Sequence, residues 1–304
     1  KRIVADLEEQ GLLVAIEDHK MAIIKSDRAG AVVEPLLSEQ WFARQSELAG
    51  PAAEAVKSGQ IRFTPDRYAK VYTDWLENIR DWNISRQLWW GHRVPVYYTE
   101  SGEPFAALSW EDAQAKAGDQ KIVRQDEDVL DTWFSSGLWP FAVLGWPQKD
   151  PNATKRYPTS VLVTDRNIIY LWVARMAMMS LDLLGQIPFR DVYIHATVLT
   201  HDGKRMSKSL GTGVDPTEVI EQHGADSLRY TLLGQAGMNQ EIRYSEKRVE
   251  DARNFCNKIW NATRFFLMNV GDEPLTRPDS LDVVDQWILS RLAATEQTVR
   301  EAYE

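Results

Sequence analysis

The stretch that decides the fold runs from residue 159 to residue 199 and reads TSVLVTDRNIIYLWVARMAMMSLDLLGQIPFRDVYIHATVL. Its SVLVT segment (160–164) is short, apolar and rich in β-branched residues, and VYIHATVL (192–199) has a similar character. Between them, residues 168–184 are apolar on most faces, which predicts a buried helix. A strand, a crossover helix and a second strand in so short a span predict a βαβ unit with parallel strands.

Both predicted strands are almost continuously apolar rather than alternating, which is typical of a sheet covered on both faces. Ligands bind to such sheets beyond the carboxyl ends of the strands. The loops that follow Val163 and Leu199 are therefore the first places to look for chemistry.

Composition and charge limit the class of protein. Hydrophobic residues make up 44% and charged residues 26%, which are globular values, and the net charge is −9, so a nucleic-acid partner would need a local basic patch. Cys256 is the single cysteine, which excludes an internal disulfide. The most apolar run, 168–184, is interrupted by Arg175 and Asp182, so we expect no membrane span. Lys1 opens a polar stretch, so we expect no signal peptide, and the single cysteine fits a reducing, cytoplasmic location.

The rest of the chain gives coarser predictions. Residues 1–18 predict a helix that runs into a strand, 68–90 carry an amphipathic apolar stripe, and 99–125 are polar enough for a surface excursion. From residue 216 onward, apolar residues recur at three- and four-residue spacing, which predicts an all-α continuation. The predicted helices are 216–223, 225–234, 246–270 and 283–303.

The loop after the second strand, THDGKRMSKSLGTGVDP (200–216), combines cations with glycines. Its basic residues are Lys204, Arg205 and Lys208, of which the lysines carry a compact ammonium charge and the arginine a planar guanidinium. The glycines let the backbone approach a ligand closely. Beyond a parallel strand, such a loop can hold a transferring nucleotidyl group by electrostatics and positioning. The alternative is a solvated basic loop without catalytic function.

One string within this loop narrows the choice. RMSKS (205–209) resembles the KMSKS signature of class I aminoacyl-tRNA synthetases, with Arg205 in place of the first lysine. Further segments resemble their counterparts in the valyl branch of that family, in the same order, and the 128–140 segment separates this branch most clearly from the isoleucyl and leucyl enzymes. These segments are DWNISRQLWWGHRVPVYY (81–98), DVLDTWFSSGLWP (128–140), IIYLWVARM (168–176), GADSLRYTLL (224–233) and ARNFCNKIWNATRF (252–265).

The resemblance implies an α/β fold, namely the second half of a class I synthetase Rossmann-like nucleotide-binding fold with parallel strands, followed by an all-α helical region. It implies a ligase that activates valine with Mg²⁺-ATP to valyl-adenylate and transfers it to tRNA(Val). The implied divisions are the end of an editing insertion (1–60), the second half of the catalytic domain (61–203), the signature loop with a stem-contact region (204–245) and the start of an anticodon-binding helical bundle (246–304).

The resemblance also assigns residues. Lys208 and Arg205 would stabilise the adenylate-forming transition state, with Lys208 as the chief catalytic residue. The implied ATP-binding residues are Asn167, His195, Met206, Ser207, Lys208 and Ser209, the valine-binding residues are Trp133, Ile168 and Trp172, and the tRNA-binding residues are Arg86, Arg93, Arg253, Lys258 and Arg264. Ile168 and Trp172 are four residues apart, so a helix would place them on one face. The indoles of Trp133 and Trp172 together can narrow a cavity enough to exclude larger side chains.

The chain departs from the family pattern in four ways. No two of its five histidines are three apart, so the H-x-G-H signature of the first catalytic half is absent. The usual Gly-x-Asp-Ile helix entry reads Asp165-Arg166-Asn167-Ile168, which puts ATP binding by these positions in question. Cysteine pairs are absent near 23–30 and in 99–125, so we expect no protein-bound zinc. Editing residues would lie upstream of Lys1, so we expect no editing activity.

We therefore expect a chain that is inactive by itself and needs the missing amino-terminal half of the same enzyme. Two alternatives remain at this point. One is a non-catalytic tRNA- or nucleotide-binding module derived from such an enzyme. The other is a synthetase of the isoleucyl or leucyl type, against which the tryptophan-rich pocket argues.

Overall fold

The computed structural model describes residues 2–26, 29–34, 36–148, 154–206, 211–237, 240–271, 274 and 278–303. The chain divides into two compact units, and each is described by itself. Unit 1 comprises Lys1–Leu162 and Ile168–Val192, and unit 2 comprises Val163–Asn167 and Tyr193–Glu304.

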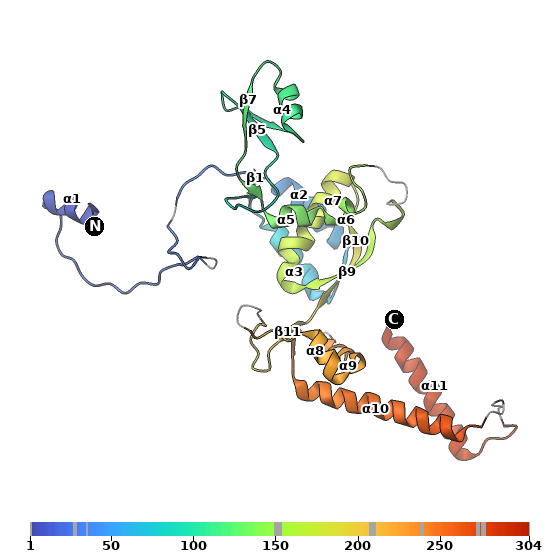
Figure 1. The fold of residues 1–304 in the computed structure, drawn as a ribbon. Helices are drawn as coiled ribbons and strands as arrows, with labels where there is room; N and C mark the ends of the chain where they lie inside the picture. The colour runs from blue at the N-terminus through green and yellow to red at the C-terminus, as the bar shows by residue number, and fades with distance from the viewer. Residues whose placement is uncertain are drawn as a thin grey trace. The chain divides into compact units, whose positions relative to one another are not determined.

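The predicted βαβ unit is present in unit 1 (Figure 1). Its strands β9 (Thr159–Asp165) and β10 (Phe189–His195) are neighbours in a sheet of order β2-β10-β9, with β2 at Arg62–Thr64. The crossover helix α7 (Ala174–Leu184) is almost fully buried over its first turns, as the apolar sequence predicts. It packs against α2 (Ser46–Lys57), which also contacts α3 (Arg67–Glu77).

The helix that we predict from residue 168 does not begin as a regular α-helix. A 3₁₀ turn at Arg166–Ile168 leads into a π-helical turn at Ile169–Val173, and α-helical geometry starts only at Ala174. Wide helical turns of this kind are rare and often occur at functional sites. Gly185 ends α7 with a left-handed φ of +67°, a conformation that glycine adopts without steric cost.

Two expectations for the strands are wrong. VYIHATVL does not form one strand, because β10 ends at His195 and β11 (Thr197–Leu199) belongs to a different sheet, where it pairs in parallel with β12 (Glu241–Arg243). β9 is not covered on both faces, because Val161 and Val163 are 50% and 58% exposed while Leu162 and Thr164 are buried. The apolar run therefore conceals an alternation in which one face of β9 remains open in this chain.

The 99–125 stretch, expected as a surface excursion, is a small folded module. Its antiparallel strands β5 (Val96–Thr99), β6 (Pro104–Ala106) and β7 (Ile122–Gln125) pair in the order β6-β5-β7, and helix α4 (Trp110–Ala117) packs on them. The module has a hydrophobic core of its own, composed of Tyr97, Ala107, Ala113, Ala117 and Ile122.

Unit 1 contains further short elements. They are β1 (Phe42–Ala43) with β3 (Trp82–Asn83), β4 (Ser85–Arg86) with β8 (Val129–Leu130), the helices α5 (Thr132–Gly137) and α6 (Trp139–Ala142), and the 3₁₀ turn Thr154–Arg156. At the amino terminus, helix α1 (Arg2–Glu9) ends as predicted near Gly11. The strand expected to follow within 1–18 is absent from the described residues there.

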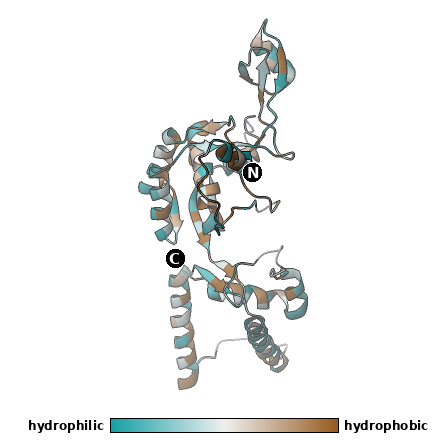
Figure 2. Cartoon of the chain, turned by 90° about the vertical axis from the view of Figure 1, so that its left-hand side faces the viewer, coloured by the Kyte–Doolittle hydropathy of each residue, from teal (hydrophilic) through white to brown (hydrophobic). Residues whose placement is uncertain are grey.

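Unit 2 contains the predicted helices with nearly the predicted bounds. They are α8 (Pro216–His223), α9 (Ala225–Ala236), α10 (Glu246–Asn269) and α11 (Val283–Tyr303). The continuation is not purely helical, because β12 intervenes. Val219, Leu228 and Val249 form a core shared by α8, α9 and α10. Both α10 and α11 mix hydrophobic with hydrophilic residues (Figure 2), and the described side chains of α11 include no buried residue.

One stretch, Arg166–Leu184, is long and apolar enough to resemble a membrane span, but 44% of its most apolar window is buried inside the protein. The core helix of a soluble protein passes the same test, so this is weak evidence for a span. The charged residues Arg175 and Asp182 lie within it, as noted from the sequence.

Candidate active site

The site begins with the cap of α5. Asp131 immediately precedes this helix, and its carboxylate accepts a hydrogen bond from the backbone N–H of Trp133 at 2.7 Å, which satisfies a donor of the first turn. Asp131 is only 5% exposed, and it also forms an ion pair with Arg86 of β4. The cap therefore fixes the backbone position from which the Trp133 side chain projects.

The predicted valine-binding residues meet in one place. Trp133, Ile168 and Trp172 line a single cavity of about 290 Å³ together with Ser136 and Trp139. The Trp172 Nε1–H donates to the backbone oxygen of Ser136 at 3.0 Å, and its ring lies 5.9 Å from that of Trp139 at an interplanar angle of 52°. The cavity is thus apolar, with indole walls supplied by α5, α6 and the π-helical turn before α7.

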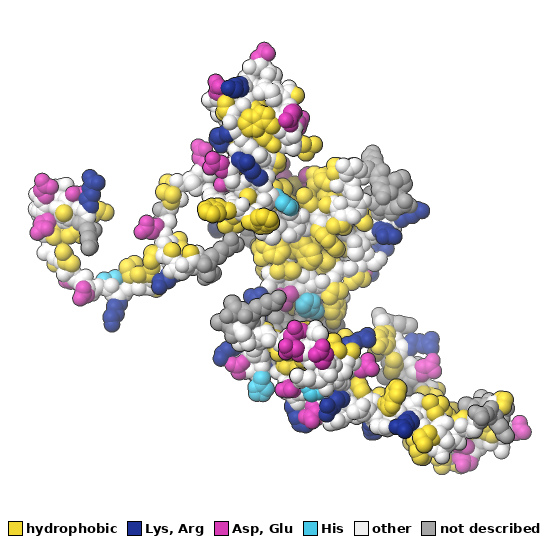
Figure 3. Space-filling model, viewed as in Figure 1, with side chains coloured by type: hydrophobic (Ala, Val, Ile, Leu, Met, Phe, Trp, Pro, Cys, Tyr) yellow, Lys and Arg dark blue, Asp and Glu magenta, His cyan; other side chains and the backbone are white. Residues whose placement is uncertain are grey.

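One face of unit 1 is rich in hydrophobic side chains (Figure 3). Figure 3 shows a continuous group of them, in yellow, over the part of unit 1 that carries α3 and α5. A gathered apolar area of this kind on a protein surface is typical of a binding or packing surface.

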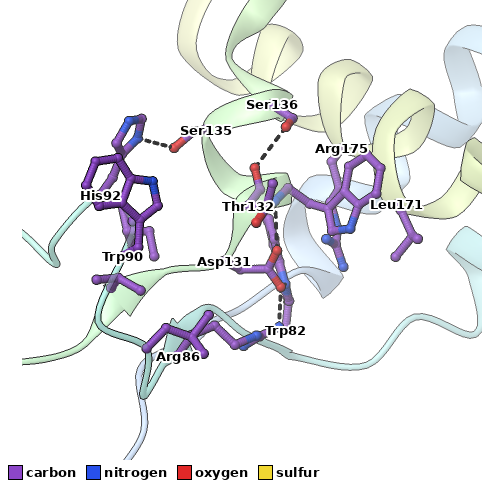
Figure 4. Close-up of a pocket in the computed structure, with 15 residues that line it drawn as sticks. Trp82, Arg86, Trp90, His92, Asp131, Thr132, Ser135, Ser136, Leu171 and Arg175 are labelled. Carbon is purple, nitrogen blue, oxygen red and sulfur yellow. Dashed lines mark hydrogen bonds and ion pairs between the residues drawn. The ribbon is translucent and has the colours of Figure 1, made fainter. Parts of the chain in front are cut away.

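A second, larger pocket of about 770 Å³ shares Trp133 and Ser136 with the first. Figure 4 shows its polar residues, where His92 Nδ1 lies 2.7 Å from Ser135 Oγ and Arg86 meets Asp131. Trp90 also lines the pocket and is 93% exposed. The pocket therefore combines hydroxyl groups, an imidazole, two guanidinium groups and one carboxylate.

Arg175 is the unusual group in this pocket. It is only 7% exposed, and its guanidinium carbon lies 3.6 Å from the ring centroid of Trp82, which is a cation–π contact. Burial lowers the pKa of Arg175 to about 10, while Asp131 opposes this change and Arg86 adds to it. Arg175 nevertheless remains charged at neutral pH.

Two of the predicted ATP-binding residues, Asn167 and His195, lie near Asp165 at the end of β9. The Asp165 carboxylate accepts from Thr197 Oγ1 at 2.6 Å and from the backbone N–H of Asn167 at 2.7 Å. Burial favours the neutral form of Asp165, but the hydrogen bonds from Thr197 and Asn167 outweigh burial and lower its pKa. Asp165 is thus an anion that orients the side chain of Asn167, and His195 lies near enough to add to the lowering.

Arg166 joins the same end of β9 to β12. Its guanidinium donates to Gln240 Oε1 at 2.9 Å and to Glu241 Oε1 at 2.8 Å. The helix entry that departs from the family pattern is therefore an organised turn, held by side chains on both sides.

The signature loop opens with a tight turn. Thr200 N–H donates to the Lys204 carbonyl at 2.8 Å, Gly203 has a φ of +81°, and Leu199 pairs with Arg205 in an antiparallel bridge. Hydrogen bonds from Lys204 and Thr200 lower the pKa of Asp202 to about 2. Arg205 is exposed and Met206 half-buried, whereas Ser207, Lys208 and Ser209 lie outside the described residues.

The predicted tRNA-binding residues have different surroundings. Arg86 is engaged by Asp131, and the Arg93 guanidinium donates to the backbone oxygens of residues 125 and 126 at 3.1 Å and 2.5 Å. On α10, Arg253 is half-buried while Lys258 and Arg264 are exposed, and among the described residues these three have no ion-pair partner. The α10 cations are therefore available to a polyanion.

Sequence reasoning missed part of this site. It did not assign Asp131, Arg175, His92 or Ser135. Of these, Arg175 could have been noticed, because it is a charged residue within the most apolar run of the chain. Within the described residues, the structure brings together no group of three His, Cys, Asp or Glu side chains suited to a metal ion. The expectation of a zinc-free protein stays a prediction.

Comparison with known proteins identifies the class. The family model for class I tRNA synthetases (I, L, M and V) matches residues 15–245, and the chain belongs to this family. Among curated proteins it is 48% identical to the valine–tRNA ligase of Symbiobacterium thermophilum, 47% to that of Clostridium acetobutylicum and 50% to that of Bacillus licheniformis. These alignments cover 99%, 100% and 99% of this chain and 33%, 35% and 34% of the relatives. The chain thus spans about a third of the length of the relatives it matches.

Solved structures share the fold at lower identity. A methionyl-tRNA synthetase of Mycobacterium tuberculosis in complex with methionyl-adenylate matches with a TM-score of 0.66 at 19% identity, covering 92% of this chain and 50% of that one. A leucyl-tRNA synthetase of Agrobacterium radiobacter K84, in a ternary complex with tRNA and LeuAMS, gives 0.53 at 19% identity and covers 62% and 29%. The class I synthetase fold predicted from the sequence is confirmed.

Proposed function

We propose that this chain is the part of a valine–tRNA ligase that supplies the amino-acid pocket, the signature loop and a tRNA-contacting region. The enzyme joins a valine carboxylate oxygen to the α-phosphorus of Mg²⁺-ATP and releases pyrophosphate. A terminal ribose hydroxyl of tRNA(Val) then attacks the adenylate carbonyl and releases AMP. The remainder of a longer enzyme, including its amino-terminal half, would complete the active site.

The observation that carries the proposal is the convergence of Trp133, Ile168 and Trp172 on one apolar cavity. An aliphatic side chain without a polar group fits a site whose walls are indole and isoleucine. The indoles that line the cavity limit its size, which favours a short branched side chain over a longer one. The valine–tRNA ligase relatives at 47–50% identity point to the same amino acid.

The remaining assignments follow the family reading. We propose that Lys208 and Arg205 stabilise charge on the ATP phosphates, because cations in a glycine-containing loop can act there by position and charge alone. Asn167, His195, Met206, Ser207 and Ser209 would complete the ATP site, and Asp165 would orient Asn167.

For tRNA, we propose Arg253, Lys258 and Arg264 of α10 as contacts with the phosphate backbone, since positioned cations on a helix read phosphates and shape. Arg86 and Arg93 would act near the acceptor end, and an RNA phosphate there would compete with Asp131 and the backbone oxygens that they now bind. We place the enzyme in the cytoplasm, without protein-bound zinc and without editing activity in this segment.

We propose the same domain divisions that the sequence suggests, with 1–60 ending an editing insertion and 246–304 opening an anticodon-binding bundle. The discriminating experiment is ATP–pyrophosphate exchange by the enzyme that contains this chain, driven in turn by valine, isoleucine, leucine and methionine. Valine should give the highest kcat/KM. A higher kcat/KM with one of the other three amino acids would reject the valine assignment.

A further inference from the structure

A buried indole joins the two helical walls of the Trp133–Ile168–Trp172 cavity. The Trp82 Nε1–H donates to Asp131 at 3.4 Å, and the Trp82 ring lies 5.8 Å from that of Phe134 in α5. On the side of α7, the Arg175 guanidinium stacks on the Trp82 ring, with its carbon 3.6 Å from the ring centroid. We call Trp82, Asp131 and Arg175 the clamp.

The clamp residues lie next to the cavity walls in the sequence. Asp131 caps the helix two residues before Trp133, and Arg175 lies three residues after Trp172 on the same helical stretch. A movement of the clamp therefore moves both indole walls.

The two helices also approach closely at Gly137. A Cβ added there would lie 2.6 Å from Met179 Sδ and 3.6 Å from Arg175 Cβ. Little slack remains between α5 and α7 at this point, so their separation depends on the side chains between them.

The charge of Arg175 indicates a positioning role rather than simple space filling. Its Nε and Nη1 are buried without a hydrogen-bond partner among the described residues, and Asp131 is shared with Arg86. A methionine would fill a similar volume without the desolvation of a charge, which burial disfavours. The contacts that Arg175 does make, to the Trp82 face and through space to Asp131, both lead to α5.

We propose that Arg175 and Asp131 are positioning residues that fix the aperture of the Trp133–Ile168–Trp172 cavity, and with it the size limit for the amino-acid side chain. This inference rests on the proposed function. Neither residue lines the 290 Å³ cavity, so both act through Trp82 and Trp133.

The test compares variants in the active enzyme that contains this chain. Arg175→Met should lower the ratio of kcat/KM for valine over isoleucine three- to tenfold, mainly by lowering the KM for isoleucine. Arg175→Lys keeps a cation over the Trp82 ring and should restore part of the ratio. Asp131→Asn keeps a residue that can cap α5 but removes the charge, and should lower the ratio as well.

Arg62→Met is the matched control, because Arg62 pairs with Asp191 on the surface of the same unit. It should leave the ratio unchanged. In a Trp133→Ala background, Arg175→Met should have a smaller effect on the ratio, since one of the two indole walls on which it acts is gone. An unchanged ratio in Arg175→Met, or an equal effect with and without Trp133, would overturn the inference and reduce Arg175 to a stabilising residue.

A second readout does not need activity. In the 304-residue chain labelled with 5-fluorotryptophan, the ¹⁹F resonance of Trp133, assigned with Trp133→Phe, should shift in Arg175→Lys and stay in place in Arg62→Met. An unmoved Trp133 resonance would overturn the inference even where Arg175→Met fails to fold. By contrast, an unaltered enzyme that shows no valine-dependent exchange would refute the proposed function itself.

Discussion

Replacing Trp133 by alanine removes one indole wall of the 290 Å³ cavity. Isoleucine is one methylene larger than valine, and steric exclusion of a methylene is worth about 1–3 kcal/mol, or roughly 5- to 150-fold in kcat/KM. Once the wall is gone, burial of that methylene becomes favourable by about 0.8 kcal/mol, which is roughly fourfold toward isoleucine. The preference for valine should therefore fall to parity or reverse.

The assay is ATP–pyrophosphate exchange with valine and isoleucine as separate substrates, with kcat/KM measured for each. Trp110→Ala is the control, because Trp110 is 43% exposed and packs edge-on against Tyr97 in the β5–β7 module, away from the cavity residues in its contacts. A Trp133→Ala enzyme that keeps the parental preference would show that Trp133 is a core residue. An equal change in Trp110→Ala would show that the effect is general loosening.

The remaining predictions concern the loop, acid stability and metal content. Lys208→Ala should slow adenylate formation about 10²–10³-fold with an unchanged melting temperature, and unchanged single-turnover kinetics would remove Lys208 from the catalytic residues. Burial favours neutral Asp126, but hydrogen bonds from Trp41 and Tyr98 outweigh it and hold the pKa of Asp126 below 3.8. The stability that this lowered pKa contributes is present above the unfolded-state pKa and is lost as the pH falls through the folded-state pKa. Asp126→Asn should therefore lower the free energy of unfolding near neutral pH by about 1–3 kcal/mol and flatten its acid dependence in urea titrations. A pH profile parallel to that of the unaltered chain would contradict this prediction. Metal analysis should find far less than one zinc per chain, and a stoichiometric amount would contradict the reading of 99–125.

Local sequence signals predicted the elements that depend on local patterns. The bounds of α8, α9, α10 and α11 follow from three- and four-residue spacing, and the strand–helix–strand order of 159–195 follows from apolar runs and the breaker at Gly185. The break at Ala196 was missed because both strands are apolar, and only pairing with β12, more than 40 residues later, separates β11 from β10. Strand pairing over such distances leaves no local signal.

The site divides in the same way. Trp133, Ile168 and Trp172 were assigned from the family resemblance, and the four-residue spacing added only that Ile168 and Trp172 share one helix face. The Asp131–Trp82 contact joins residues 49 apart, and the stacking of Arg175 on Trp82 joins residues still farther apart, so neither shows in any sequence window. The core of the 96–125 module was missed because it is built partly from alanines, which do not form a long apolar run.

The central claim is that this chain forms the valine pocket and signature loop of a ligase whose amino-terminal half supplies the rest of the active site. Valine-dependent ATP–pyrophosphate exchange tests it directly, with the chain alone and with a separately supplied amino-terminal half of a valine–tRNA ligase. Exchange should occur only when both parts are present. No exchange in either condition, with both parts folded and associated, would contradict the claim and leave a tRNA- or nucleotide-binding module as the better account.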